Sequence, residues 1–266
     1  MEAYAPPLAH RILIPVDFTD CAQNALRFAC TLAEDTGADL LVLHVRTEET
    51  PEAALSERME AFVRQALGGT TLTYRTEIRT GEVAKVVGEV ATAAAADLIV
   101  MGTVGERKPP ESFGSVTWQV MTHVDRPVLA VPEGSKPAHV GRVAFLSDLS
   151  QVEHPRSLMP LLRLVDMFNA ELHVVNVKPR AAAMPPDKTR VAMELERDLE
   201  DIPHCFHVIE ADDVVQAAGA FAERQTIDLL AVMPRKHDEL DQQYAGRLTR
   251  EMALHSTLPL LAFHEA

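Results

Sequence analysis

The 266-residue sequence has few cysteines, no long hydrophobic run and no secretion-type leader. Three cysteines are too few for a disulfide framework, and Cys21 and Cys30 fall on opposite sides of an expected helix, so we expect a protein of the reducing cytoplasm. The apolar runs, such as DLIVMG and DLLAVM, have the length of strands, whereas a membrane-spanning helix needs about 20 residues. The opening MEAYAPPLAH lacks the basic and apolar segments of a secretion signal.

The sequence also lacks clusters of positive charge, because no run of basic residues is longer than the two of Arg107-Lys108. The net charge is −14, with 12 basic and 19 acidic residues up to Lys136, so each half of the chain carries about the same negative charge. Binding to a phosphate backbone requires a basic footprint. The sequence therefore predicts neither nucleic acid nor an anionic membrane as a partner.

The chain contains two copies of one sequence repeat. RILIPVD (11–17) recurs as RVAFLSD (142–148), ADLLVLHV (38–45) as AELHVVNV (170–177), DLIVM (97–101) as DLLAV (228–232), and RPVLAVP (126–132) as LPLLAFH (258–264). Four blocks in the same order, each displaced by 131 or 132 residues, indicate a duplicated domain. We place the two copies at 1–136 and 137–266, joined near the linker-like segment 132–141.

Each copy alternates short apolar strands with amphipathic helices, a pattern typical of a parallel sheet covered on both faces. We therefore expect an α/β fold of two doubly wound domains, each with five parallel strands in the order 3-2-1-4-5. The two fifth strands, PVLAVP and PLLAFH, should lie at exposed apolar edges that need covering. We expect these edges to face each other across a pseudo-twofold axis.

In this strand order, the first and fourth strands are neighbours whose helices leave to opposite faces, and ligands of open α/β sheets bind in the crevice between them. In the first copy that crevice receives Asp17 from strand one and the loop 102–115 from strand four. The loop carries Gly102, Gly105 and Gly114-Ser115, and a helix should begin at Ser115. Glycines and a helix N-terminus suit a phosphate group, although the sequence fits neither a Walker loop nor the dinucleotide fingerprint.

The glycine pattern after strand four resembles the universal stress protein family in its tandem form, over nearly the whole chain. Nucleotide-binding members carry G-x2-G-x9-G-[ST] there, whereas this sequence has eight residues between Gly105 and Gly114 and includes Pro109-Pro110. The resemblance implies ATP, with or without Mg²⁺, in the first domain. It implies contacts to adenosine from Pro15, Asp17 and Val45, and to the phosphates from Gly102, Gly105, Gly114, Ser115 and Val116.

The second copy departs further from this pattern, because Met233 and Lys236 replace the first two glycines and Arg247 replaces the serine. We expect that half to hold no ATP. The resemblance implies a nucleotide-responsive stress regulator or protective factor. The alternatives are a nucleotide-free interaction scaffold and a slow nucleotide hydrolase, and no catalytic residues are assigned. A protein partner, and a homodimer of the whole chain, are compatible with the sequence but are not located by it.

Several of these residues also have ordinary structural explanations. Asp17 could brace the first helix, Gly102 and Gly105 could permit a tight turn, and Ser115 could be a plain N-cap. The run His204-Cys205-x-His207 invites a metal interpretation, but in a strand its two histidines point to opposite faces. We therefore expect no metal site.

Overall fold

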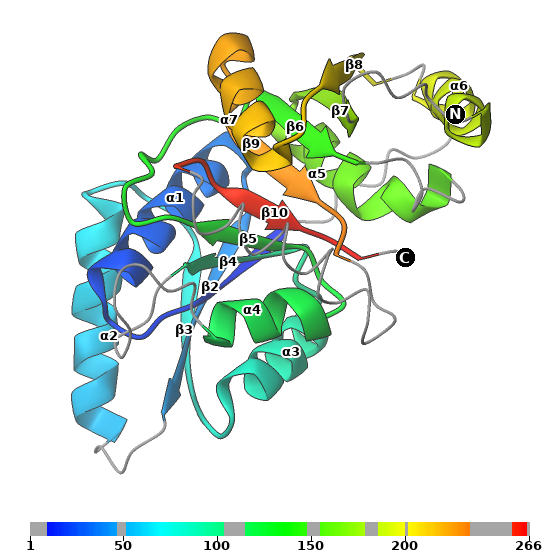
Figure 1. Ribbon diagram of the computed structural model, residues 1–266. Helices are drawn as coiled ribbons and strands as arrows, with labels where there is room; N and C mark the ends of the chain where they lie inside the picture. Colours follow the sequence, from blue (N-terminus) through cyan, green and yellow to red (C-terminus); the bar gives the residue numbers. More distant parts are fainter. Residues whose placement is uncertain are drawn as a thin grey trace, which may run out of the picture.

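The computed structural model describes residues 10–46, 52–103, 115–147, 155–178, 186–199, 202–234 and 257–264. Strands and helices alternate along the chain (Figure 1). The elements of the first half are β1 (Arg11–Pro15), α1 (Asp20–Thr36), β2 (Asp39–Arg46), α2 (Glu52–Leu67), β3 (Tyr74–Thr80), α3 (Val83–Ala93), β4 (Leu98–Gly102), α4 (Ser115–His123) and β5 (Val128–Val131). Those of the second half are β6 (Arg142–Leu146), η1 (Pro155–Leu158), α5 (Met159–Phe168), β7 (Glu171–Lys178), α6 (Pro186–Asp198), β8 (His204–Glu210), α7 (Val214–Gln225), β9 (Leu229–Val232) and β10 (Leu260–Ala262).

The strands form a single ten-stranded sheet in the order β3-β2-β1-β4-β5-β10-β9-β6-β7-β8. Within each half all neighbouring strands are parallel. Each half therefore has the expected order 3-2-1-4-5, and the doubly wound α/β fold class is confirmed.

The two halves meet at β5 and β10, which pair antiparallel and lie side by side at the centre of Figure 1. Leu129 pairs with Leu261 in the middle of this ladder. These two leucines occupy the same position of the two repeats, 132 residues apart, so equivalent residues face each other as a pseudo-twofold axis requires. The expectation that the fifth strands cover one another is confirmed.

The repeats also share contacts outside the strands. The backbone N–H of Arg11 donates to Asp97 at 2.9 Å, and that of Arg142 donates to Asp228 at 2.9 Å. The residues at 95 and 226, 131 positions apart, both adopt positive φ, 49° and 50°. Recurrence of such local geometry supports the duplication, whereas the boundary between 136 and 137 stays a prediction.

Local signals explain where the first helix begins and ends. The Thr19 side chain accepts a hydrogen bond from the backbone N–H of Ala22 and so caps α1. Gly37 ends the helix in the left-handed conformation, at φ 69°. The cysteines Cys21 and Cys30 on this helix are buried and, like exposed Cys205, free of disulfides. Burial raises the pKa of the Cys30 thiol to about 11, which keeps it protonated.

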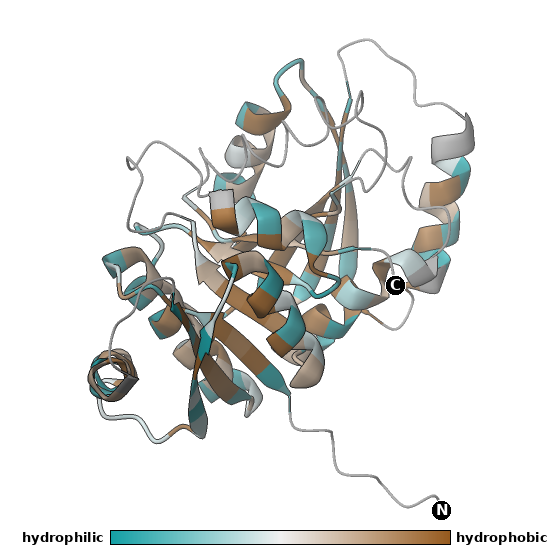
Figure 2. Ribbon diagram, turned by 90° about the horizontal axis from the view of Figure 1, so that it is seen from below, coloured by the Kyte–Doolittle hydropathy of each residue, from teal (hydrophilic) through white to brown (hydrophobic). Residues whose placement is uncertain are grey.

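Helices cover both faces of the sheet, and the central strands are the most hydrophobic part of the ribbon (Figure 2). One face packs against α1, α2, α5 and α6 through Leu26, Met59, Leu161 and Leu195. The other face packs against α3, α4 and α7 through Val87, Val120 and Phe221. Both clusters extend across the two repeats, so the halves share their core. None of the described helices is long and apolar enough to cross a membrane.

The segment 132–141 is fastened to the first half. The Asn24 amide of α1 donates to the carbonyl oxygens of Pro132 and Ser135, at 3.0 and 2.8 Å. His139 contacts Asp35 of the same helix at 2.9 Å. The sequence composition indicates a linker, and the contacts show that this mostly exposed segment is bonded to α1 at Asn24 and at Asp35.

Candidate functional site

The carboxyl ends of β1 and β4 lie at the place where the strand order predicts a ligand crevice. Ile12 and Leu13 pair with Leu98 and Ile99, so the two strands run side by side and end at the same edge of the sheet. From that edge α1 leaves to one face and α4 to the other. Pro15, the last residue of β1, is half-buried and pairs with Leu43 of β2.

Asp17, the first polar residue beyond β1, is half-buried and holds the turn into α1. One of its carboxylate oxygens accepts hydrogen bonds from the backbone N–H and the hydroxyl of Thr19, at 3.2 and 2.6 Å. Because Thr19 itself caps α1, Asp17 braces the helix start, as the structural alternative anticipated. A contact from Asp17 to a ligand stays a prediction.

Phe18 has a backbone conformation that the sequence does not signal. Its φ is 65°, in a region that costs energy for a residue with a bulky side chain. Its ring lies 4.5 Å from the His44 ring and 5.4 Å from the Phe62 ring, with the Arg58 guanidinium 4.2 Å above it. These contacts hold Phe18 at the mouth of the crevice despite the strained backbone.

His44 supports the same turn from the neighbouring strand. Its Nδ1 lies 2.9 Å from the carbonyl oxygen of Val16, and since a carbonyl only accepts, Nδ1 carries the hydrogen and donates. In the second repeat, the Asn176 amide donates to the carbonyl oxygen of Ser147 at 3.0 Å. The two repeats thus fasten the same turn with different side chains.

Gly102 ends β4 where the strand touches the first turn of α1. A Cβ at this position would lie 2.7 Å from the Cys21 sulfur and 3.1 Å from the Cys21 backbone. The missing side chain is therefore required by packing between β4 and α1. This explanation needs no ligand, and it adds a packing role to the two expectations for Gly102, the approach of a phosphate and a tight turn.

Thr117 joins the two ends of the glycine loop. Its hydroxyl donates to the carbonyl oxygen of Gly102 at 2.9 Å, and its side chain is buried. The first turn of α4, which begins at Ser115, is thereby fixed beside the end of β4. Sequence reasoning overlooked Thr117, because a threonine inside a helix looks like an ordinary helix residue.

The other predicted site residues differ in burial, and some of them lie outside the described residues. The Val45 side chain is buried in the core, so only its backbone could reach a ligand. Val116 is half-buried and packs on the α3–α4 core. Gly105 and Gly114 lie outside the described residues, as do Asp148, Lys236, Gly246 and Arg247 of the second repeat. Met233, the counterpart of Gly102, is partly buried against the core beyond β9.

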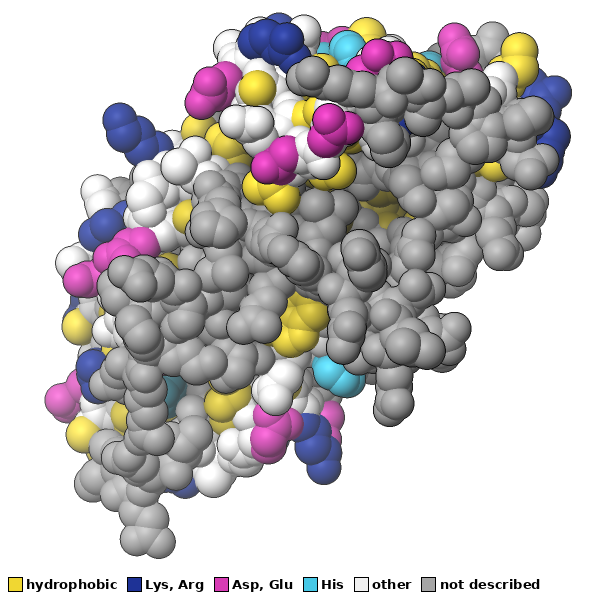
Figure 3. All heavy atoms as spheres, in the orientation of Figure 1, with side chains coloured by type: hydrophobic (Ala, Val, Ile, Leu, Met, Phe, Trp, Pro, Cys, Tyr) yellow, Lys and Arg dark blue, Asp and Glu magenta, His cyan; other side chains and the backbone are white. Residues whose placement is uncertain are grey.

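The charges on the described surface fit the acidic composition. Lysine and arginine side chains lie at separate places on the face shown in Figure 3, with acidic side chains between them. The described part of that face shows no cluster of basic side chains. The prediction of no nucleic-acid partner is consistent with this view and stays a prediction.

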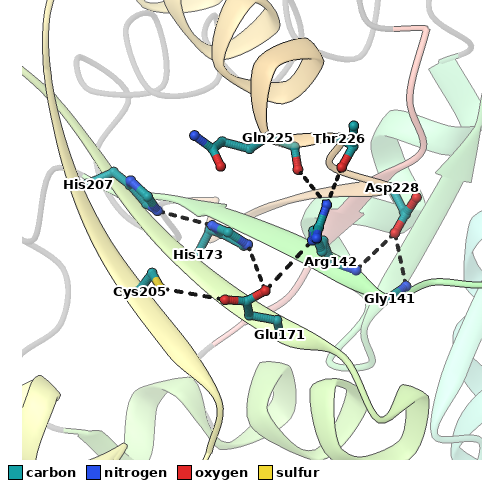
Figure 4. Close-up of polar contacts among 9 residues, drawn as sticks. All are labelled: Gly141, Arg142, Glu171, His173, Cys205, His207, Gln225, Thr226 and Asp228. Atoms are coloured by element: carbon teal, nitrogen blue, oxygen red, sulfur yellow. Dashed lines mark hydrogen bonds and ion pairs between the residues drawn. The ribbon is translucent and has the colours of Figure 1, made fainter.

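A second polar cluster lies on β6, β7 and β8, away from the crevice (Figure 4). Nδ1 of His173 lies 3.0 Å from Nε2 of His207, and Nε2 of His173 lies 3.6 Å from the Glu171 carboxylate. The thiol of Cys205 donates to Glu171 at 3.5 Å, and Arg142 approaches the same carboxylate at 3.7 Å. Burial lowers the pKa of both histidines and raises that of Cys205.

His173, Cys205 and Arg142 all approach the Glu171 carboxylate, whereas the three histidines and the thiol do not surround a shared position. Glu171 lies on one side of the His173 ring and His207 on the other, and His204 donates from Nδ1 to the carbonyl oxygen of Ile202, outside this network. Among the residues that the structure describes, no group of three or more His, Cys, Asp or Glu is arranged to hold a metal ion. The described cluster is a polar network that runs from buried His173 to the exposed side chains of Arg142 and Cys205 in the second repeat.

The fold defines a tandem, doubly wound α/β protein in which β1 and β4 of the first repeat end side by side. The model of the universal stress protein family matches residues 9–132. The first repeat therefore belongs to the universal stress protein family, and the resemblance inferred from the glycine pattern is confirmed. No curated protein matches the chain.

Two solved structures are similar in fold over nearly the whole chain. A universal stress protein from Archaeoglobus fulgidus DSM 4304 is 16% identical with a TM-score of 0.73, covering 96% of this chain and 98% of that chain. A functionally unknown protein from Pseudomonas aeruginosa PAO1 is 14% identical with a TM-score of 0.68, covering 97% and 93%. At these identities the likeness concerns the fold alone.

A half-length neighbour is the universal stress protein from Archaeoglobus fulgidus in complex with dAMP. It is 22% identical with a TM-score of 0.38, covering 46% of this chain and 97% of that chain. The bound nucleotide is a property of that protein.

Proposed function

We propose that the first repeat binds ATP or a related adenine nucleotide in the β1–β4 crevice and acts as a nucleotide-responsive regulator or protective factor. Adenosine would contact Pro15, Asp17 and the backbone of Val45. The phosphates would meet Gly102, Gly105, Gly114, Ser115 and Val116. Mg²⁺ would accompany the phosphates as an optional ion.

The position of α4 is the observation that carries this proposal. Thr117 ties the first turn of α4 to the end of β4, so the positive end of the helix dipole lies beside the carboxyl end of β4. A phosphate group is the ligand class that such a helix start accepts. Family membership of residues 9–132 supports the same choice.

We propose that the second repeat holds no ATP. Its strand β9 ends before Met233, where the first repeat has Gly102, and the Met233 side chain packs against the core. A side chain at this position alters the end of the strand on which the cradle depends. Asymmetry between the repeats is therefore part of the proposal.

The interaction scaffold is the second candidate, and two observations favour it. Packing against Cys21 accounts for Gly102 without a ligand, and bracing of Thr19 accounts for Asp17. A scaffold would keep both residues for folding alone. Slow hydrolysis of a bound nucleotide stays a weaker alternative, and the partner protein, homodimer and cytoplasmic location stay predictions.

Mass spectrometry of the freshly purified, denatured protein separates these candidates. Released ATP supports the proposed function, whereas AMP or ADP alone favours hydrolysis. If nothing is released and added ATP, ADP and AMP also fail to raise the melting temperature, the scaffold interpretation replaces the proposal.

A further inference from the structure

The helix that begins at the proposed phosphate site ends at the junction of the two repeats. Val120, Met121 and Val124, in and just after α4, belong to the same buried cluster as Leu260 and Ala262 of β10. The last strand of the second repeat therefore packs against the helix that the first repeat would use for its ligand.

A buried histidine adds a hydrogen bond to this contact between the repeats. His264, two residues beyond β10, is 6% exposed, and its Nε2 lies 2.8 Å from the carbonyl oxygen of Met121. Because a carbonyl only accepts, Nε2 carries the hydrogen and donates. A helix leaves its last four carbonyl groups without intrahelical donors, and Met121 is among the last four residues of α4. The second repeat thus supplies a C-terminal cap to a helix of the first.

The first repeat has no histidine at the position equivalent to His264. The position equivalent to His264 in the first repeat is Pro132, whose side chain has no donor. The carbonyl oxygen of Pro132 instead accepts from Asn24 within its own repeat. The second repeat, which lacks the glycines of the loop 102–115, therefore supplies the capping histidine. The first repeat, which has these glycines, contains the capped helix α4.

We propose that His264 is a positioning residue for the nucleotide site: by capping α4 from the second repeat, it holds the start of that helix against β4 in the geometry that binds phosphate. The helix is fixed at both ends, by Thr117 to Gly102 and by Met121 to His264. The inference rests on the proposed function and explains a use for a second repeat that binds no ATP itself. Coupling between sites is reciprocal, so nucleotide should also steady β10.

The test compares ATP affinity, by titration calorimetry, in three variants of the full chain. His264→Leu keeps much of the volume and removes the donor, whereas His264→Gln keeps a side-chain N–H. Ser135→Ala is the matched control, since the Ser135 hydroxyl donates to the carbonyl oxygen of Thr257 at 2.7 Å and crosses the same junction without touching α4. We expect His264→Leu to weaken ATP binding about fivefold or more, with the Gln and Ser135→Ala variants close to wild type.

Hydrogen exchange of the wild type provides a second measurement that needs no variant to fold. ATP should slow amide exchange in β10 as well as around the crevice. If the wild type binds ATP but His264→Leu binds equally well, or Ser135→Ala loses as much affinity, or β10 exchange is unchanged by ATP, the positioning role is wrong while the proposed function stands. If the wild type binds no adenine nucleotide, both fall.

Discussion

The hydroxyl of Thr117 donates a hydrogen bond to the carbonyl oxygen of Gly102 at 2.9 Å, joining the two ends of the glycine loop. The loop between them thus starts and finishes at one place in the fold, whatever path it follows. Closure of this kind lets a loop lose a residue between Gly105 and Gly114 without moving the helix start. We therefore expect nucleotide binding to tolerate the shortened spacing, as the proposed function requires.

Removing the Thr117 hydroxyl should destabilise the fold. Thr117→Val leaves a buried carbonyl oxygen without this donor, and such losses cost about 1–3 kcal/mol. Thr117→Ser keeps the donor and should lose less. Urea unfolding measures both, and equal stability of the Val variant and the wild type would show that the bond contributes nothing.

Adding a methyl group at two glycines should have opposite effects. Gly102→Ala forces a Cβ against Cys21 and should destabilise the protein by about 1–3 kcal/mol. Gly219→Ala, at an exposed position in the middle of α7 with no atom within 4 Å of the new Cβ, should stabilise it by about 0.5–1 kcal/mol. Thermal unfolding compares them, and a neutral Gly102→Ala would refute the close approach of β4 to α1.

Acidification should loosen the outer strands of the second repeat. Burial lowers the pKa of His173 and His207 below the ordinary histidine value, so the folded protein binds fewer protons than the unfolded chain. Their contribution to stability is complete above the unfolded pKa of about 6.5 and is lost as the pH falls below it. Two protonated rings whose facing nitrogens, Nδ1 of His173 and Nε2 of His207, lie 3.0 Å apart would also repel each other.

Hydrogen exchange at pH 7.5 and 5.5 localises this effect. Exchange corrected for its intrinsic pH dependence should rise in β8 at the lower pH, and less in β3, the equivalent edge strand of the first repeat, which contains no histidine. His207→Gln, whose amide can either donate to or accept from His173 and does not titrate, should reduce the difference. Equal responses of β3 and β8 would contradict the role of the pair.

Patterns of apolar residues were sufficient to predict the architecture. Strand-length apolar blocks, their repetition at 131 or 132 residues and the right-handed crossover rule lead to the observed order and to the pairing of β5 with β10. Caps at Thr19 and Gly37 follow from local chemistry in the same way. These features depend on residues close in sequence or on periodicity, both of which can be read without a structure.

The finer features of the crevice depend on approach between distant segments. The contact of Gly102 with Cys21, the bond from Thr117 and the strained Phe18 each require knowledge of how closely an element packs on another. His264 could have been noticed, because a histidine closes an apolar strand where the first repeat has proline. Its partner, a carbonyl oxygen of the other repeat, has no sequence signal.

The stoichiometry of ATP binding, measured by titration calorimetry on the full chain, tests the central proposal most directly. We expect one ATP per chain. Binding should be weakened by Asp17→Ala, abolished by Gly114→Val and unchanged by Asp148→Ala, which alters the matching position of the second repeat. With a Kd on the order of 10 μM, millimolar ATP should add roughly 2.7 kcal/mol of stability, which a melting curve would register independently. Absence of binding by ATP, ADP and AMP, or two ATP per chain, would contradict it.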